Sequence, residues 1–226
     1  MSLKLGVLLS GSGSNLEALA GRIEEGALEA EIALVVSDRP GAYGLNRAKS
    51  RGLATYLASS KEFPERGDRE RAIIEALREH GVEAVVMAGY MRLVSGGFIR
   101  AFGGRVLNIH PSLLPGFKGT RAVKEAAEYG VRVSGATVHF ADEHMDHGPV
   151  VIQAAVAVHP GEEAMELADR IQALEHRIYP QAVQWLSQGR LILDQGLVRL
   201  ADAPTAAALD TEAGPCLVSP GLEQGF

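Results

Sequence analysis

The sequence is short of cysteine and has no long apolar run near its start. Cys216 is the single cysteine among 226 residues, which excludes an internal disulfide framework and fits a reducing compartment. The first apolar run covers only a few residues before glycines follow, too short for a signal peptide or a membrane span. We therefore expect a cytoplasmic protein with no membrane partner.

The sequence also lacks an excess of positive charge. Its 22 Lys and Arg residues stand against 28 Asp and Glu residues, for a net charge of −6. This balance argues against nucleic acid as a partner, although a local basic cleft can still hold one phosphate. A hydrophobic content of 46% and a charged content of 22% are ordinary for a globular protein. We expect small-molecule partners, and the chain as a monomer or homodimer.

Apolar runs alternate with helical patterns through the first half, which predicts βαβ units and a parallel sheet. Apolar residues at helical spacing distinguish the helices from the strands, which read as continuous apolar runs. The pattern predicts strands at residues 3–9, 31–37, 54–58, 83–89 and 105–110. It predicts helices at residues 15–23, 44–52, 65–81 and 95–102.

The second half has a different pattern. Two strands, 131–140 and 150–158, are most simply an antiparallel pair, followed by a long helix over 162–189 and a small hairpin over 190–200. We expect an α/β fold: a Rossmann-like open sheet, parallel in the amino-terminal half, with antiparallel strands added in the carboxyl-terminal half. We predict one domain over 1–202, with halves 1–110 and 111–202. Residues 203–226 lack apolar periodicity, which predicts a loose tail.

The segment "SGSGSN", Ser10 to Asn15, lies between the first strand and the first helix. Glycines let the backbone approach an anion, and the helix start offers free N–H groups, so a phosphate site is one interpretation. A plain turn with Ser14 as the N-cap of a capping box is equally compatible. A dinucleotide site, with Asp38 as the ribose-binding acid, is disfavoured because Leu16 stands where the fingerprint needs a small residue.

Asn108 and His110 are two residues apart at the carboxyl end of a predicted strand, so their side chains project to the same side. Open α/β sheets bind ligands at this end. An amide N–H and a protonated imidazole aimed at one point stabilise a developing oxyanion. The alternative is that both side chains cap loop backbone. The residues alone do not decide between the two interpretations.

The loop after the strand at 131–140 reads "ADEHMDHGP" and is rich in acids and histidines. It is a solvated loop, a metal site, or the source of a carboxylate that orients His110 and favours its protonated form. Glu175 projects from the apolar stripe of the long predicted helix, where a carboxylate needs a partner. That partner is either a structural cation or a substrate amine.

Six segments together carry a resemblance to a known family: "LLSGSGSNLEAL", "AGYMRLVS", "NIHPSLLPGFKG", "SGATVHF", "DEHMDHGPVI" and "EHRIYP". In this order, across roughly residues 4 to 200, they resemble the glycinamide ribonucleotide transformylases of purine biosynthesis. The Asn-x-His-Pro-Ser-Leu-Leu-Pro segment is shared with other enzymes that use 10-formyltetrahydrofolate, so it marks the chemistry. The glycine-rich loop narrows the choice, because that family uses it to hold the ribose phosphate of its substrate.

The resemblance implies roles for particular residues. It implies a catalytic trio of Asn108, His110 and Asp146. It implies that the ribonucleotide is bound by Gly13, Ser14, Asn15, Arg66 and Glu175. It implies that the folate is bound by Met91, Arg92, Leu93, Val94, Phe140, Ala141, Asp142 and Glu143. The segment "FKGTRAV" has no histidine where relatives commonly have one, and His147 replaces a usual glycine.

The implied reaction is direct attack of the glycinamide amine on the formyl carbon of 10-formyltetrahydrofolate, the co-substrate, with no metal and no covalent enzyme intermediate. Methionyl-tRNA formyltransferase and formyltetrahydrofolate deformylase share this chemistry. The methionyl-tRNA formyltransferases are expected to carry a further domain after the formyl-transfer domain. The deformylases are expected to carry one before it. A nucleotide-binding module without catalysis is the non-enzyme alternative, and it leaves Asn108, Asp146 and Glu175 without a purpose.

Overall fold

A computed structural model describes residues 2–211 and 213–226. Residues 1 and 212, which belong to the predicted domain and the predicted tail, lie outside the described residues. The chain forms two compact units. The first runs up to Asn108 and includes Phe140–His144, and the second comprises Ile109–His139 and Met145–Phe226. Whether 1–202 behaves as a single domain stays a prediction.

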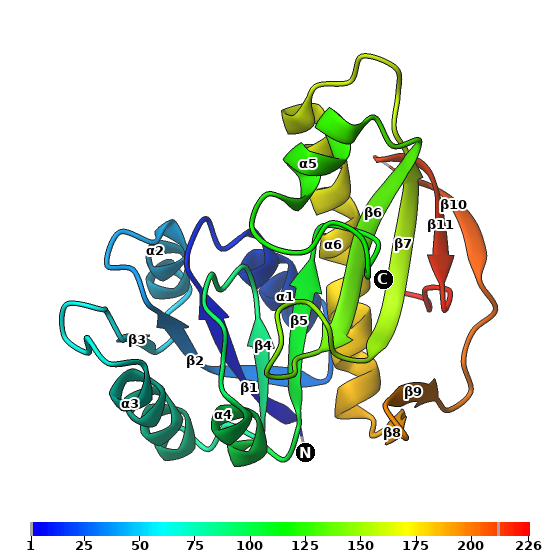
Figure 1. Cartoon of the computed structure of the whole chain (residues 1–226). Coiled ribbons are helices and arrows are strands. Elements are labelled where there is room, and N and C mark those ends of the chain that lie inside the picture. The colour runs from blue at the N-terminus through cyan, green and yellow to red at the C-terminus, as the bar shows by residue number, and fades with distance from the viewer. Residues whose placement is uncertain (1, 212) are drawn as a thin grey trace. The chain divides into compact units, whose positions relative to one another are not determined.

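The strands of the first unit are parallel and lie side by side in the order β5-β4-β1-β2-β3 (Figure 1). This order places the first strand of the chain in the centre. Nearly every residue of β1 and β4 is buried, as expected for parallel strands covered on both faces. The strands are β1 (Leu3–Leu9), β2 (Ala30–Ser37), β3 (Thr55–Leu57), β4 (Ala84–Met87) and β5 (Val106–His110).

Four helices connect these strands, and all four were predicted. The core beneath them packs Ile73 and Leu77 of α3 and Phe98 of α4 against the side chains of β1, β2 and β4. These apolar side chains are almost completely buried, so the helical periodicity of the sequence marks the core face. The helices are α1 (Ser14–Glu24), α2 (Tyr43–Ser50), α3 (Arg66–Glu79) and α4 (Gly96–Ala101).

The start of α1 corrects one prediction. The N-cap is Gly13, which has a left-handed φ of 76°, and no side chain caps the helix, so Ser14 is not the N-cap. A Cβ at Gly13 would lie 2.6 Å from the Cα of Gly44 at the start of α2, so a side chain has no room there. Glu17, the expected partner of a capping box, binds Arg51 of the neighbouring segment at 2.8 Å instead.

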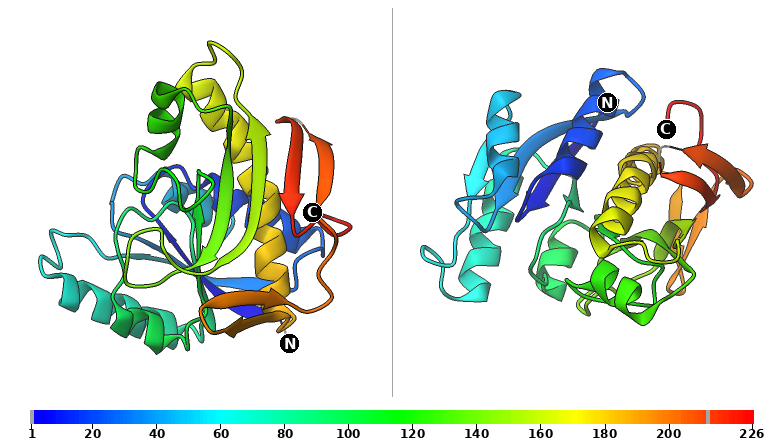
Figure 2. Two further views of the ribbon diagram at one scale, coloured as in Figure 1. Left: turned by 45° about the vertical axis from the view of Figure 1, so that its right-hand side comes forward. Right: turned by 90° about the horizontal axis from the view of Figure 1, so that it is seen from above.

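In the second unit, β6 (Val133–Phe140) and β7 (Val150–Ala157) form the predicted antiparallel pair. The long helix α6 (Ala164–Ser187) runs beside β7 (Figure 2). Its apolar stripe is buried: Leu167, Ile171, Leu174 and Ile178. The predicted hairpin is present as β8 (Leu191–Asp194) and β9 (Leu197–Leu200). Helix α5 (Ala122–Tyr129) was not predicted.

The prediction of a loose tail after Ala203 is wrong. β10 (Ala207–Thr211) and β11 (Gly214–Ser219) pair with each other, and β11 pairs with β7. Val218 is 1% exposed and Phe226 is 8% exposed, so this segment supplies apolar surface to the unit. Arg177 donates a hydrogen bond to the carbonyl of Phe226 at 2.8 Å. The segment is ordered because its backbone groups are satisfied by a strand that would otherwise have an open edge.

The chain therefore has the predicted α/β fold, with a parallel sheet in the amino-terminal half and antiparallel strands in the carboxyl-terminal half. Among the described residues, no helix combines the length and the apolar character that crossing a membrane requires.

Candidate functional site

The second unit brings His110 and Asp146 together. His110 ends β5 and is 4% exposed, and its Nδ1 lies 3.4 Å from Oδ2 of Asp146. This distance exceeds that of a usual hydrogen bond, and the contact is an ion pair only when the ring carries a hydrogen on both nitrogens. The same carboxylate oxygen accepts a hydrogen bond from the backbone N–H of Gly119 at 2.7 Å. The carboxylate is therefore oriented by the chain that follows the His110 turn.

The other ring nitrogen of His110 has a partner that fixes its protonation. Nε2 lies 2.8 Å from the carbonyl oxygen of Phe117. A carbonyl oxygen can only accept, so Nε2 must carry the hydrogen of this bond. In the neutral ring the hydrogen therefore sits on Nε2, and Nδ1 is left to exchange protons on the side of Asp146. This division of tasks suits a residue that binds a substrate oxygen or moves a proton.

Two non-glycine residues of this site have left-handed backbone conformations. Phe117 and Asp146 each have φ of 48°. Such conformations cost on the order of 1 kcal/mol each and gather at functional sites. At Phe117 the conformation accompanies the carbonyl bond to His110, and its ring packs edge-on against Tyr129 at 6.0 Å between centroids. The strain thus coincides with the groups that position His110 and Asp146.

Asn108 lies on the same strand, two residues before His110, and is partly buried. β5 includes both residues, and side chains two positions apart on a strand project to the same side. The sequence therefore places an amide next to the imidazole along one strand, at the carboxyl end where this class of sheet binds ligands.

In the first unit, the glycine-rich loop has the form that an anion site requires. Gly13 and Asn15 are buried at the start of α1, and Ser14 is half-buried. Gly13, the N-cap of α1, supplies no side-chain hydrogen bond to the first turn of the helix. The start of a helix favours an anion through its backbone N–H groups and its dipole. Hydrogen bonding to Arg51 lowers the pKa of Glu17, so that carboxyl group stays ionised and paired away from the loop. This arrangement is compatible with a phosphate.

The same loop begins with a buried polar network. Ser10 donates to Asp38 at 2.6 Å and accepts from the backbone N–H of Met91 at 2.9 Å. Arg92 donates to the second oxygen of Asp38 at 2.6 Å. Both oxygens of Asp38, which is 4% exposed, are therefore engaged by protein donors. Asp38 therefore has no oxygen left for a ribose, which argues against a dinucleotide site. The network instead holds the segment that begins at Met91.

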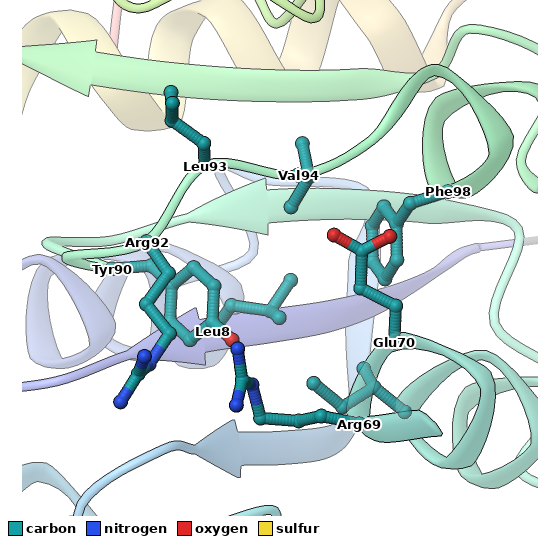
Figure 3. A pocket seen from close by; sticks show the side chains of 9 residues that line it. Leu8, Arg69, Glu70, Tyr90, Arg92, Leu93, Val94 and Phe98 are labelled. Atoms are coloured by element: carbon teal, nitrogen blue, oxygen red, sulfur yellow. The ribbon is translucent and has the colours of Figure 1, made fainter. Parts of the chain in front are cut away.

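That segment borders a small pocket of the first unit (Figure 3). The polar ends of Tyr90, Arg92 and Arg69 gather at one side of it, and the Glu70 carboxylate faces Phe98 at the other. Burial raises the pKa of Tyr90 to about 12, and Asp38 adds to the effect. The phenol therefore stays neutral at physiological pH.

The residues expected to bind folate have different exposures. Met91 and Leu93 are 50% and 45% exposed, whereas Val94 is 3% exposed and packs into the core. Arg92 is held by Asp38 and by the hydroxyl of Ser60 at 2.5 Å. Phe140 is buried, Ala141 and Asp142 are half-buried, and Glu143 is exposed. Met91 and Leu93 are thus the members of this set that offer apolar surface to a ligand.

Two further predicted residues are placed as follows. Arg66 begins α3 and its side chain, 49% exposed, pairs with Glu70 at 2.9 Å. Glu175 is 7% exposed on α6, as its position on the apolar stripe predicts. A buried carboxylate on that stripe is suited to meet a cation.

The residues of the acidic loop that were considered as metal ligands do not all belong to one unit. Nδ1 of His144 lies 4.0 Å from Oδ1 of Asp142 in the first unit, whereas His147 belongs to the second unit. The backbone N–H of His144 also donates to Asp142 at 2.9 Å, which is the geometry of an ordinary turn. Both histidines are exposed, and exposed groups of this kind are common without an ion.

Sequence reasoning missed the groups that hold the His110 turn. The Phe117 carbonyl and the Gly119 N–H are backbone groups, so their contacts cannot be predicted from the type of residue that carries them. Thr137 and Gln153 were not predicted as site residues. Both are polar residues inside strongly apolar strands, and this contrast is the sequence signal that points to them.

The parallel sheet and the imidazole–carboxylate pair at the end of β5 define a Rossmann-like α/β protein with a site suited to acid–base chemistry. Comparison with known proteins makes the class specific. The formyl transferase family matches residues 3–183, so the chain belongs to the formyl transferase family.

Individual relatives carry more specific names. The chain is 42% identical to phosphoribosylglycinamide formyltransferase of Bacillus subtilis over 183 residues, which cover 81% of this chain and 94% of that protein. The crystal structure of glycinamide ribonucleotide transformylase 1 from Symbiobacterium toebii matches with a TM-score of 0.87 and 45% identity, covering 89% of this chain and 95% of that one. The chain is also 43% identical over 187 residues to the trifunctional purine biosynthetic protein adenosine-3 of Gallus gallus, and these cover 83% of this chain but only 19% of that protein.

Proposed function

We propose that this protein is a phosphoribosylglycinamide formyltransferase, which transfers the formyl group of 10-formyltetrahydrofolate to the amine of glycinamide ribonucleotide in purine biosynthesis. The similarity to proteins of that name over most of both chains supports this assignment. The single structural observation that carries the chemistry is the pairing of His110 with Asp146 at the end of β5. The other activities of the trifunctional relatives are not extended to this chain.

In the proposed mechanism, the amine attacks the formyl carbon, and the carbonyl oxygen becomes an oxyanion. Asn108 and His110 stabilise it by hydrogen bonds that strengthen as the negative charge develops. Since Nε2 of His110 donates to Phe117, the Nδ1 edge is the one left for the substrate oxygen. The new carbon–nitrogen bond forms, the bond to N10 of the folate breaks, and tetrahydrofolate leaves.

Asp146 has two tasks in this scheme. Its carboxylate lies 3.4 Å from Nδ1, so it can pair with the imidazole when that ring donates a hydrogen to the oxyanion. It also assists removal of the proton that the attacking nitrogen must lose, which ends on the folate N10. No covalent enzyme intermediate is formed.

The remaining residues bind the two substrates. Gly13, Ser14 and Asn15 present the start of α1 to the ribonucleotide phosphate. The Glu175 carboxylate binds the amine of the ribonucleotide. Arg66 also binds this substrate, and for that its guanidinium gives up part of its ion pair with Glu70. Met91, Arg92, Leu93 and Val94, with residues 140–143, form the folate site, in which Arg92 orients the segment through Asp38.

The proposal extends to the setting of the reaction. We place the enzyme in the cytoplasm, where a buried free thiol such as Cys216 stays reduced. Its partners are the two small-molecule substrates, with no nucleic acid, and it acts as a monomer or a homodimer.

A spectrophotometric assay with and without glycinamide ribonucleotide tests this function. We expect the folate product to appear only when the ribonucleotide is present. Hydrolysis of the donor at the same rate without acceptor would favour a deformylase. Transfer to methionyl-tRNA but not to the ribonucleotide would favour the other relative of this chemistry.

A further inference from the structure

A buried polar network lies beneath the turn that follows His110. Thr137 and Gln153 are directly opposed on β6 and β7. The Thr137 hydroxyl donates to the carbonyl of Ser112 at 2.7 Å and accepts from the N–H of Leu114 at 3.1 Å. The amide of Gln153 donates to the carbonyl of Leu114 and to the same hydroxyl, both at 3.0 Å. Two side chains of the sheet thus bind three backbone groups of the turn.

The direction of every bond in this network is determined by chemistry. A backbone N–H and an amide NH₂ can only donate, so the Thr137 oxygen accepts twice and its hydrogen must point to Ser112. The Leu114 carbonyl can only accept, which fixes the Gln153 amide with its nitrogen toward the turn. Thr137 is completely buried, so a lost bond would leave a polar group unsatisfied. The network has no equivalent alternative arrangement.

The turn transmits this constraint to His110. Ser112 donates from its hydroxyl to the carbonyl of Gly116 at 2.7 Å, which closes the turn just before Phe117. The Phe117 carbonyl then accepts from Nε2 of His110 at 2.8 Å. The turn also packs closely against β6, because a Cβ at Gly135 would lie only 3.0 Å from Cδ2 of Leu113. A shift of Ser112 or Leu114 therefore moves the atom that fixes the ring of His110.

We propose that Thr137 and Gln153 are positioning residues for His110: they hold the 112–117 turn so that the Phe117 carbonyl keeps the imidazole in its Nε2–H form, with Nδ1 toward Asp146. The inference rests on the proposed function of His110. Neither residue touches a substrate in this scheme. Both act through the turn, so their loss changes the chemical step and not the binding of either substrate.

The test compares matched variants. Thr137→Val removes the hydroxyl with little change in shape, Thr137→Ser retains it, and Gln153→Met removes the amide. Thr211→Val is the control, because Thr211 likewise donates to one backbone carbonyl, at 3.0 Å, and accepts from one backbone N–H, at 3.1 Å, in the same unit but on β10. Steady-state kinetics with both substrates and melting temperatures are measured for all four.

We expect Thr137→Val and Gln153→Met to lower kcat by about tenfold or more with each KM within about threefold, as for a misplaced catalytic group. Thr137→Ser should restore most of the rate, and Thr211→Val should match the wild type. Values of kcat within about twofold of the control for both Thr137→Val and Gln153→Met would overturn the proposal. If Thr137→Val does not fold, the Gln153→Met result decides.

A second measurement reads the ring directly. Long-range proton–nitrogen NMR of nitrogen-labelled protein, with His110 assigned from a His110→Gln variant, reports the tautomer of the neutral ring. The wild type should show hydrogen on Nε2, and Thr137→Val should show a mixture of both forms. An unchanged tautomer in the variant would contradict the proposal even if the rate fell. This readout does not need formyl transfer, so an inactive wild type would sink the proposed function and leave the positioning test standing.

Discussion

The two ring nitrogens of His110 have different partners, and those partners assign different tasks. Nε2 is held by a backbone carbonyl, whereas Nδ1 faces a carboxylate at a distance too long for a tight bond. In the proposed reaction, a substrate oxygen at the Nδ1 edge therefore competes with a weak contact and not with a strong one. The imidazole is held in place on one side and open to chemistry on the other.

At the residue scale, Asn15 tests the phosphate assignment. We expect Asn15→Ala to raise KM for the ribonucleotide by roughly tenfold to a hundredfold, because a lost hydrogen bond to a charged group costs about 1.5–3 kcal/mol. KM for the folate should change much less. Ser12→Ala, at an exposed position of the same loop, is the control and should leave both constants unchanged. Equal increases for the two substrates would show that Asn15 serves the loop structure alone.

The residues of the site differ in how well sequence could predict them. Asn108 and His110 were predicted as a pair because their spacing and the strand end are local features. Asp146 is 36 positions after His110, and the residues alone left it among several acids of one loop. Only the resemblance to a family singled it out. The Phe117 carbonyl could not be predicted, because a backbone group contacts His110 only after the turn adopts its left-handed conformation.

At the scale of elements, periodicity predicted the parallel strands and the long helix well. Helix α5 was missed because its buried residues are only Ala122 and Ala126, too small to mark an apolar stripe. The strands after Ala203 were missed because their order comes from pairing with β7, some sixty residues earlier in the chain. Pairing over such a separation leaves no local signature in a segment rich in Ala, Pro and Gly.

Strand β11 allows a matched test of the corrected carboxyl-terminal segment. Val218 is 1% exposed, whereas its neighbour Leu217 is 52% exposed on the opposite face. We expect Val218→Asp to lower the melting temperature markedly, since burying an unpaired charge costs several kcal/mol. Leu217→Asp should change the melting temperature little. Similar melting temperatures for the two variants, measured by circular dichroism, would show that the segment does not contribute to stability.

At the scale of the whole molecule, the response of stability to high pH has an identifiable source. Burial raises the pKa of Tyr90 from 10.0 in the unfolded chain to about 12 in the fold. Stability tied to the neutral phenol is thus complete below pH 10 and is lost as pH rises toward 12. We expect Tyr90→Phe to lose less stability between these values than the wild type. Tyr129→Phe, at a position 81% exposed, is the control.

Melting temperatures between pH 9 and pH 12 make this comparison. Parallel curves for the wild type and Tyr90→Phe would mean that other groups determine the alkaline response. A curve flattened only in Tyr90→Phe would locate the response at the polar network beside Arg92.

The proposed formyl transfer rests most on the pair of His110 and Asp146. One measurement addresses that pair directly: single-turnover formyl transfer by the wild type and by Asp146→Asn, each with and without chelator. Asparagine suits the left-handed backbone at this position and can still accept from Gly119, so the variant should fold. We predict that Asp146→Asn transfers the formyl group at a rate lower by about a hundredfold or more, which is the scale of a general acid–base group. Substrate binding should be largely retained, and chelator should change neither protein. Near-normal transfer by Asp146→Asn, or a wild type silenced by chelator and restored by a divalent ion, would contradict the account.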